Sequence, residues 1–252
     1  GSSLADSEQV QKVVRIVQAA QANKPLVVCS AHKGITNLLV AAGKNAAAGK
    51  ADASPIVDRQ RAIATSLGVS LEPLEPMFEQ LQDLLRGISL VRELSPRVFD
   101  HVQSFGERMS VRVVADVLRQ QGSEAQAFDA WDLGFITDSA FGTARPLEGY
   151  RARIREAVTD KIPDNMIAVV TGFVGHTIDG AISTVGRNGS DFSAAVFAAA
   201  LGADECQIWT DTDGVMSSDP NLIEGARSIP SMSFAEAGEL AWYGGRVLHP
   251  ST

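Results

Sequence analysis

Apolar residues recur along this chain at helical spacing in the first half, and in short runs separated by helical segments in the second half. Valines spaced over 8–22 predict a first helix, with Asp6 or Ser7 as its N-cap. The short apolar run 26–30 predicts a buried strand, and a polar turn then leads to a predicted helix over 37–49. The chain is therefore expected to open as a helix–strand–helix unit.

The pattern over 56–120 is helical almost throughout. Its first apolar stripe consists of Met77, Leu81, Leu84, Leu85, Ile88 and Val91. Ser95 and Pro96 then have the residue types of a cap and a first helical position. The second stripe has the same spacing and consists of Val98, Val102, Phe105, Met109 and Val113. Gly122 ends this helical region, and 124–128 predicts a strand.

Strands and helices alternate in the second half. Apolar runs predict three strands, over 167–171, 181–185 and 206–210. The alanine-rich segment 190–201 predicts a helix that can pack close to a sheet. Ser233 and Glu236 predict the capping box of another helix, which ends at 244–245. This alternation predicts an α/β fold with three αβα layers, in which two lobes surround one continuous, mostly parallel central sheet.

Composition excludes several classes of protein. The 252 residues are 45% hydrophobic and 21% charged, as in an ordinary globular α/β domain. The formal net charge of -8 disfavours nucleic acid and anionic membrane surfaces as partners, and no apolar run approaches the roughly 18 residues of a membrane span. The four histidines lack metal-ligand spacing, so we assign none of them to a metal, and the metal-binding residues stay unknown. Cys29 and Cys206 lie in apolar runs that predict buried thiols.

A glycine-rich turn joins the strand predicted over 181–185 to the helix predicted over 190–201. It reads Gly-Arg-Asn-Gly-Ser-Asp over 186–191, and the start of a helix favours an anion such as phosphate. Arg187 adds donors suited to a carboxylate or phosphate, and Asp191 could hold Mg²⁺ or orient the groups around it. An ordinary turn with an N-cap explains the segment equally well. It is neither a Walker A loop nor a dinucleotide-binding fingerprint.

Two carboxylates follow the strand predicted over 206–210. The segment reads Asp-Thr-Asp-Gly over 211–214, at the end of a strand, where ligands collect in open α/β sheets. The remaining ligands of a calcium-binding EF-hand loop are missing. Taken alone, the segment is more typical of a solvated turn rich in aspartate.

Gly106 interrupts a helical stretch between Phe105 and Glu107. A glycine inside a helix costs about 1 kcal/mol relative to alanine, so the close approach of a ligand or of another backbone must offset this cost. Glu107 would then be an acid that faces a cleft. Taken alone, the segment is more typical of a surface glutamate beside a packing glycine.

Taken together, these segments resemble the aspartate kinases of the amino-acid-kinase fold. Five segments match motifs of that family, in the same order. They are 30–39 (Ser-Ala-His-Lys-Gly-Ile-Thr-Asn-Leu-Leu), 105–107 (Phe-Gly-Glu), 186–191, 209–220 (from Trp-Thr-Asp to Asp-Pro) and 244–250 (from Gly-Gly to Leu-His-Pro). Residues 93–97 and 134–137 look most like the plant-type monofunctional enzymes, while 186–191 is also similar to the kinase half of bifunctional aspartate kinase–homoserine dehydrogenases.

The resemblance implies ATP-dependent phosphorylation of the side-chain carboxylate of L-aspartate, with Mg²⁺, as the first step of lysine, threonine and methionine biosynthesis. It implies that aspartate is bound by Ser30, Thr36, Glu107, Phe173, Arg187 and Ser190. Arg187 would bind the α-carboxylate, Glu107 would face the α-amino group, and Asp191 together with Arg187 would be catalytic. The nucleotide would be bound by Thr210, Asp211, Met216, Asp219, Asn221 and Arg246. Three of these residues, Met216, Asn221 and Arg246, differ from the residue types that many relatives have at the same positions.

The resemblance also implies a single kinase domain over 1–252 that is cut at both ends. An amino-acid-binding lobe would span about 1–172, and a nucleotide-binding lobe about 173–252. The family's opening lysine motif and its regulatory ACT domains would lie outside the chain, so we expect little or no activity from the chain alone. The full-length protein would be a homo-oligomer, cytoplasmic in bacteria or plastidial in plants.

Other functions stay open at this point. One is that of another kinase of the same fold, such as an acetylglutamate, glutamate or uridylate kinase, which segments 105–107 and 248–250 disfavour. Another is that of a relative that binds an amino acid or a nucleotide without turnover, which Arg187, Asp191 and Asp211 disfavour. A nicotinamide dehydrogenase would need a glycine fingerprint that this stretch lacks.

Overall fold

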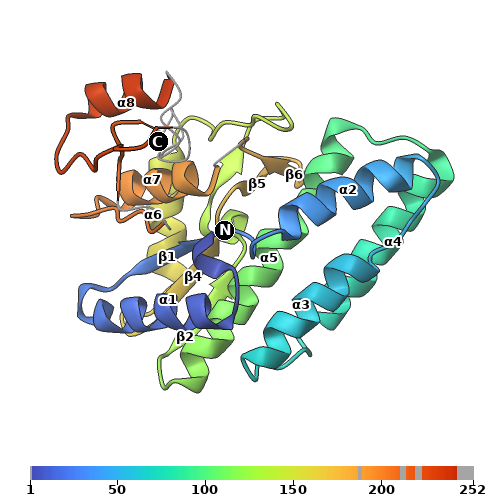
Figure 1. Cartoon of the computed structure of the whole chain (residues 1–252), viewed down its shortest axis with the longest axis horizontal. Helices are drawn as coiled ribbons and strands as arrows, with labels where there is room; N and C mark the ends of the chain where they lie inside the picture. Colours follow the sequence, from blue (N-terminus) through green and yellow to red (C-terminus); the bar gives the residue numbers. More distant parts are fainter. Residues whose placement is uncertain (1, 187–188, 211–213, 219–222, 243–252) are drawn as a thin grey trace.

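The computed structural model describes residues 2–186, 189–210, 214–218 and 223–242 (Figure 1). The helices are η1 (Ser2–Leu4), α1 (Ser7–Ala19), η2 (Gln21–Asn23), α2 (Ile35–Ala47), α3 (Ser54–Ser66), α4 (Glu75–Val91), α5 (Pro96–Gln120), η3 (Ala130–Leu133), α6 (Tyr150–Lys161), α7 (Gly189–Leu201) and α8 (Phe234–Trp242). The strands are β1 (Leu26–Cys29), β2 (Ala125–Phe128), β3 (Ile136–Thr137), β4 (Ile167–Thr171), β5 (Val174–Thr177) and β6 (Ile182–Thr184). Within this part of the chain, no helix combines the length and the apolar composition that a membrane crossing requires.

Three parallel strands form the central sheet, in the order β1-β4-β2. Side chains alternate between the two faces of a sheet, and here they belong to two hydrophobic cores. Val27 and Val169 pack in the core that α1 and α5 share, whereas Val28 and Val170 pack in the core that α6 and α7 share. Helices therefore cover both faces of the sheet, which confirms the predicted three-layer α/β fold.

The described strands form two separate sheets, so the prediction of one continuous sheet is wrong for the described residues. The second sheet consists of β3, β5 and β6, with β3 parallel to β5 and β5 antiparallel to β6. Between β4 and β5 the backbone of Phe173 adopts a φ of 63°, and this left-handed residue turns the chain away from the central sheet. The strand predicted over 181–185 is confirmed as the shorter β6.

The strand predicted over 206–210 is wrong, because these residues have no regular secondary structure. Cys206 lies on the surface, unlike the buried Cys29, and Trp209 is 57% exposed. The Trp209 carbonyl accepts a hydrogen bond from the Ser3 hydroxyl (3.2 Å) rather than from a neighbouring strand. An apolar run of this length does not distinguish a strand from a partly exposed loop.

Predicted caps mark three of the helix starts, including Ser95 at the start of α5. The Asp6 carboxylate accepts the Gln9 N–H at the start of α1 (3.0 Å). Ser233 and Glu236 form the reciprocal bonds of a capping box at the start of α8. Helix α2 begins at Ile35, slightly earlier than predicted.

Helix α5 joins the layers of the molecule. It packs against β2 and β4 on one side and against α2 and α4 on the other, and α3 and α4 pack on α2 beyond it (Figure 1). Its predicted apolar stripe is buried, with Val98 half buried. The stripe of α4 is buried over most of its length, but Val91 is 71% exposed because α4 ends there, at Arg92 in a left-handed conformation.

A buried carboxylate clamps α5 to the second sheet. Asp100 accepts the N–H of Gly142 (2.8 Å), the N–H of Thr184 (2.8 Å) and the hydroxyl of Thr184 (2.9 Å). Burial raises the pKa of Asp100, and the three hydrogen bonds oppose that shift. Because β6 leads directly into residues 186–191, this clamp determines where the glycine-rich turn begins.

Gly106 lets α5 approach the segment that follows β1. A Cβ atom at Gly106 would lie 2.8 Å from the Cβ of Ala31 and 3.3 Å from Cδ1 of Leu39. Neither distance leaves room for an alanine without movement of the neighbours. The close approach of another segment therefore accounts for a glycine in the middle of the helix.

We predict that Gly106→Ala lowers the free energy of unfolding by about 1–3 kcal/mol, because overpacking outweighs the gain in helix propensity. Gly87 is the matched control, since it lies inside α4 and a Cβ added there has nothing within 4 Å. Gly87→Ala should therefore raise the free energy of unfolding by up to about 1 kcal/mol. Urea unfolding measures both changes, and shifts of the same sign would contradict the packing role of Gly106.

Candidate active site

The carboxyl ends of β1 and β4 lie side by side at one edge of the central sheet. The Gly172 N–H, directly after β4, donates to the Cys29 carbonyl at the end of β1 (2.8 Å). Ser30 follows β1 and Phe173 follows Gly172, so two of the predicted aspartate-binding residues lie at this edge. In open α/β sheets, ligands bind outside the carboxyl ends of the strands.

The Glu107 carboxylate reaches this edge from α5. It is 4% exposed, and its Oε1 accepts the Ala31 N–H at 3.2 Å. Its Oε2 is buried and has no hydrogen-bond partner among the described residues. Burial raises the pKa of Glu107 to about 7, and the bond from Ala31 opposes this only in part. The surface position favoured by the segment alone is wrong, and this carboxylate is suited to a ligand that is both a cation and a hydrogen-bond donor.

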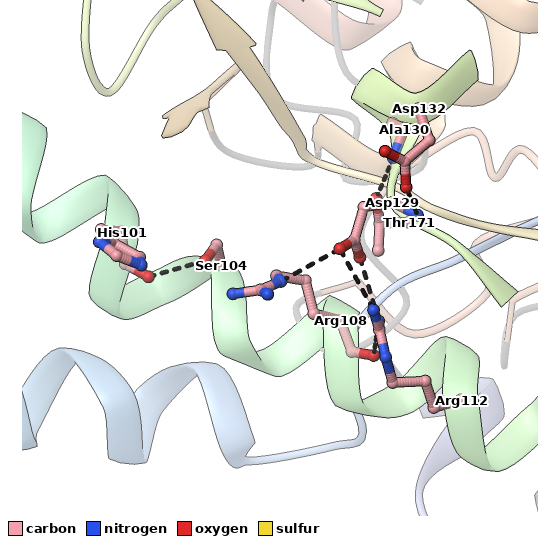
Figure 2. A network of polar contacts seen from close by, with 8 residues as sticks. All are labelled: His101, Ser104, Arg108, Arg112, Asp129, Ala130, Asp132 and Thr171. Carbon is pink, nitrogen blue, oxygen red and sulfur yellow. Dashed lines mark hydrogen bonds and ion pairs between the residues drawn. The ribbon is translucent and has the colours of Figure 1, made fainter. Parts of the chain in front are cut away.

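Two arginines anchor α5 beside the site. Arg112 donates two hydrogen bonds to Asp129 (3.0 and 3.2 Å), and Nε of Arg108 adds a third at 3.4 Å (Figure 2). Asp129 is buried in the turn between β2 and η3, so these charge-assisted bonds are partly shielded from water. The Arg108 guanidinium also lies over the rings of Phe105 and Trp131. These contacts hold the helix that carries the buried glutamate against the sheet.

The same turn fixes the end of β4. The Ala130 N–H donates to the Thr171 hydroxyl oxygen (2.9 Å), as Figure 2 shows. On the neighbouring strand, the Ser110 hydroxyl of α5 donates to the Ser30 carbonyl (2.6 Å). The ends of both strands are therefore held from outside the sheet, Thr171 by a backbone N–H group and Ser30, just after β1, by a side chain.

The first turn of α7 packs against the turn after β4. A Cβ atom at Gly172 would lie 2.6 Å from the Cβ of Ser190, and one at Gly189 would lie 2.9 Å from Cδ2 of Phe173. The unpaired N–H groups of a helix start therefore lie beside the carboxyl edge of the sheet. The left-handed backbone of Phe173 costs about 1–2 kcal/mol for a residue that is not glycine, so neighbouring groups must stabilise it.

Asp191 follows Ser190 in the first turn of α7 and is half buried. Burial raises the pKa of the Asp191 carboxyl. Partial desolvation, together with the negative charge of Asp191, raises the pKa of the Cys206 thiol. Asp191 therefore lies close to the segment that leads to Thr210.

The short helix η1 connects the two sides of the site. Its Leu4 carbonyl accepts hydrogen bonds from Nδ1 of His32 (3.0 Å) and from the Lys33 N–H (3.4 Å). The Ser3 hydroxyl donates to the Trp209 carbonyl (3.2 Å). Residues 2–4 therefore span from the loop after β1 to the exposed residues 209–210, where the nucleotide is expected.

The structure brings together part of the predicted site. The residues gathered at the carboxyl edge are Ser30, Glu107, Phe173 and Ser190, with Asp191 next to them. Thr36 lies half buried in the first turn of α2. Met216 forms an isolated antiparallel β-bridge with Ser228, in the segment 223–230. The predicted residues that lie outside the described part of the chain are Arg187, Asp211, Asp219, Asn221 and Arg246.

Sequence patterns missed three buried polar residues that hold the site, namely Asp100, Asp129 and Ser193. The spacing of Asp100 was a usable signal, because it lies two helical turns before Glu107 on the same helix. Asp129 gave no such signal, since its partner Arg112 is 17 positions away. Ser193 is inconspicuous in an alanine-rich helix, where a serine more often bonds within its own helix.

Comparisons with known proteins identify similar sequences and a similar structure. The sequence pattern of the amino acid kinase family matches residues 1–252. Aspartokinase 2, chloroplastic, of Arabidopsis thaliana is 39% identical over 259 residues, which cover 99% of this chain and 48% of the relative. Lysine-sensitive aspartokinase 3 of Escherichia coli (strain K12) is 35% identical, with 100% of this chain and 56% of the relative covered. The chain thus spans about half the length of these relatives.

A solved structure is similar over the whole chain. The crystal structure of E. coli aspartokinase III in complex with aspartate and ADP (R-state) matches with a TM-score of 0.86 and 32% sequence identity. The match covers 100% of this chain and 57% of that chain. The similarity to a plant chloroplastic protein also agrees with the plant-type resemblance of residues 93–97 and 134–137.

We predict that Glu107 makes the stability of the protein fall as pH rises. Its pKa is 4.5 in the free side chain and about 7 in the folded chain. Between these values the folded state binds more protons than the unfolded state, so the free energy of unfolding decreases from pH 4.5 to about 7, by at most about 3 kcal/mol. Glu107→Gln should remove this contribution.

Urea unfolding from pH 4.5 to 8 measures the effect as the difference between the wild type and Glu107→Gln. Taking the difference cancels the other titrating groups. Parallel pH profiles for the two proteins would show that Glu107 titrates normally and is not buried as described.

Proposed function

The chain belongs to the amino acid kinase family, and we propose that it carries the catalytic part of an aspartate kinase. In the proposed reaction, a side-chain carboxylate oxygen of L-aspartate forms a bond to the γ-phosphorus of ATP, and the bond between that phosphorus and ADP breaks. The products are 4-phospho-L-aspartate and ADP. One observation carries the proposal: the buried Glu107 carboxylate at the carboxyl edge of the sheet, whose Oε2 has no partner among the described residues.

Glu107 is suited to the α-ammonium group of an amino acid. An ammonium group offers three hydrogen-bond donors and a positive charge, which offset the desolvation of a buried carboxylate. Because the pKa of Glu107 is about 7 in the ligand-free chain, an ammonium group beside it would favour the ionised form and release a proton. We assign the α-carboxylate of the substrate to Arg187, and the remaining contacts to Ser30, Thr36, Phe173 and Ser190.

The first turn of α7 is suited to the phosphates. Its N–H groups and the positive end of the helix dipole lie beside Gly172, at the same edge as Glu107. The nucleophile is a carboxylate, which is already ionised at pH 7, so the reaction needs no general base. What remains is to bring two anions into line and to stabilise their charge, which is the main part of phosphoryl-transfer catalysis. Arg187 and Asp191 are the residues proposed to act on the reacting groups.

The residues present fit a magnesium ion that arrives with the nucleotide. Mg²⁺ is usually held by one or two carboxylates, by water and by the phosphates of the substrate, and not by a dedicated protein cage. Among the described residues, no group of three His, Cys, Asp or Glu side chains gathers as metal ligands, while Asp191 offers a single carboxylate at the helix start. Bound Mg²⁺ would neutralise phosphate charge.

The nucleotide side of the proposal rests on the similarity to known proteins. The E. coli structure that this chain resembles is a complex with aspartate and ADP, which supports the binding of both ligands here. We propose that ATP is bound by Thr210, Asp211, Met216, Asp219, Asn221 and Arg246. The lobes over about 1–172 and 173–252 would then bind the amino acid and the nucleotide respectively.

For the whole protein we propose a homo-oligomer that acts in the biosynthesis of lysine, threonine and methionine. Its compartment would be the plastid in a plant and the cytoplasm in a bacterium. The chloroplastic Arabidopsis relative supports the first alternative, and the second is kept because the E. coli relative is bacterial.

We predict that the natural gene product forms aspartyl hydroxamate when it is incubated with ATP, Mg²⁺, L-aspartate and hydroxylamine, which traps the acyl phosphate. L-Glutamate and N-acetyl-L-glutamate should give less than about one hundredth of this rate, since a site that pairs buried polar groups rejects a misfit ligand strongly. Turnover of glutamate or acetylglutamate in place of aspartate would identify a different kinase of the family. Binding of aspartate and ATP without any turnover would identify a non-catalytic relative.

Asp191→Asn should lower kcat by about a hundredfold or more, because it removes a charge at the reacting centre. Nucleotide affinity, measured by isothermal titration, should change less than about threefold. The exposed Asp204, just after α7, supplies the control variant Asp204→Asn, which removes the same charge from an exposed position. A normal rate in Asp191→Asn, or an equal loss in both variants, would refute the role of Asp191.

A further inference from the structure

We propose that Ser193 is a positioning residue, which holds the backbone of Phe173 against the first turn of α7 and thereby supports binding of the amino-acid substrate. This inference rests on the proposed function, since it concerns the same site. Ser193 itself offers no exposed surface to a ligand, because it is 0% exposed. It would act through its two hydrogen-bond partners.

The Ser193 hydroxyl links two separate elements. It donates to the Gly189 carbonyl, four positions earlier in α7 (2.9 Å), and it accepts the N–H of Phe173 from the turn after β4 (3.0 Å). The single hydroxyl proton is committed to the carbonyl, so the lone pairs remain for the N–H group. A serine that bonds only to its own helix is common and has a local effect. The second bond, to a residue 20 positions away, is what ties α7 to the sheet.

Phe173 is a residue that needs such support. Its φ of 63° lies in the left-handed region, which a bulky side chain rarely adopts, and such a conformation persists only where the surroundings enforce it. The Ser193 hydroxyl binds its N–H, and the Val185 N–H donates to its carbonyl (3.0 Å). Both polar groups of the strained residue are therefore held, and only the Ser193 contact comes from α7.

The space around this contact leaves little freedom. A Cβ atom at Gly172 would lie 2.6 Å from the Cβ of Ser190, and one at Gly189 would lie 2.9 Å from Cδ2 of Phe173. The turn after β4 and the first turn of α7 are therefore as close as glycine permits. Loss of the Ser193 hydroxyl would remove the described partner of the Phe173 N–H and would let Phe173 relax. That relaxation would change the spacing between two predicted aspartate-binding residues, Phe173 and Ser190.

Ser193→Ala tests this role through ligand binding, which does not depend on turnover. In the natural gene product, isothermal titration should show at least tenfold weaker binding of L-aspartate, while the affinity for ATP changes less than threefold. Steady-state kinetics should show the same split, as a raised KM for aspartate with a nearly unchanged KM for ATP. Ser193→Thr retains the hydroxyl and should keep aspartate binding within threefold of the wild type.

The matched control is Ser104→Ala. Ser104 is also 0% exposed, but its hydroxyl donates only to the His101 carbonyl, three positions earlier in its own helix (2.7 Å). Both alanine variants therefore lose one buried serine hydroxyl, and only Ser193→Ala should weaken aspartate binding. If Ser193→Thr does not fold, the contrast between the two alanine variants still decides the matter.

The outcomes separate this inference from the proposed function. If the wild type binds aspartate and Ser193→Ala binds it equally well, or if both alanine variants lose affinity equally, the positioning role is refuted and the kinase proposal stands. If the wild type binds no aspartate, the proposed function fails and this inference fails with it.

Discussion

The close approach of α5 to the segment after β1, at Gly106, is the constraint on which the site depends. Because Gly106 has no Cβ, Ala31 packs directly against the helix, and its N–H reaches the carboxylate of the next residue, Glu107. That carboxylate is thereby buried with one oxygen paired and the other unpaired. Its desolvation costs free energy in the ligand-free protein, and a bound ammonium group would offset this cost. The site is therefore prepared for a cation by a steric feature of the helix.

Buried polar contacts then keep this geometry from relaxing. Asp129 ties α5 to the turn after β2, Asp100 ties the same helix to β6, and Ser193 ties α7 to the turn after β4. Each contact joins a helix that carries part of the site to a different structural element. Hydrogen bonds away from water are strong when they are satisfied and costly when they are broken, so such contacts restrict the site to one arrangement.

The net charge of the chain and the local charge at the site favour different ligands. A net charge of -8 disfavours large anionic partners, yet the proposed substrates are two small anions. The N–H groups at the start of α7 lie beside the carboxyl edge of the central sheet, and they favour anions there despite the negative charge of the whole chain. The substrate cation would be met by Glu107 and the substrate anions by backbone donors, so overall charge is a poor guide to what this edge binds.

Local spacing was sufficient to predict most of the helices, the three parallel strands of the central sheet and the close approach at Gly106. It did not predict α6, and it placed Glu107 on the surface, so the role of Glu107 came only from the resemblance to a family. Burial of one face imposes a period on each helix or strand, and that period is visible in neighbouring positions. The segment 206–210 was predicted wrongly because a strand also needs a partner strand, which an apolar run cannot reveal. The bonds from Ala31 to Glu107 and from Phe173 to Ser193 join residues 76 and 20 positions apart. Such contacts depend on how the layers pack in space, and the spacing of neighbouring residues in the sequence does not determine which distant residues meet.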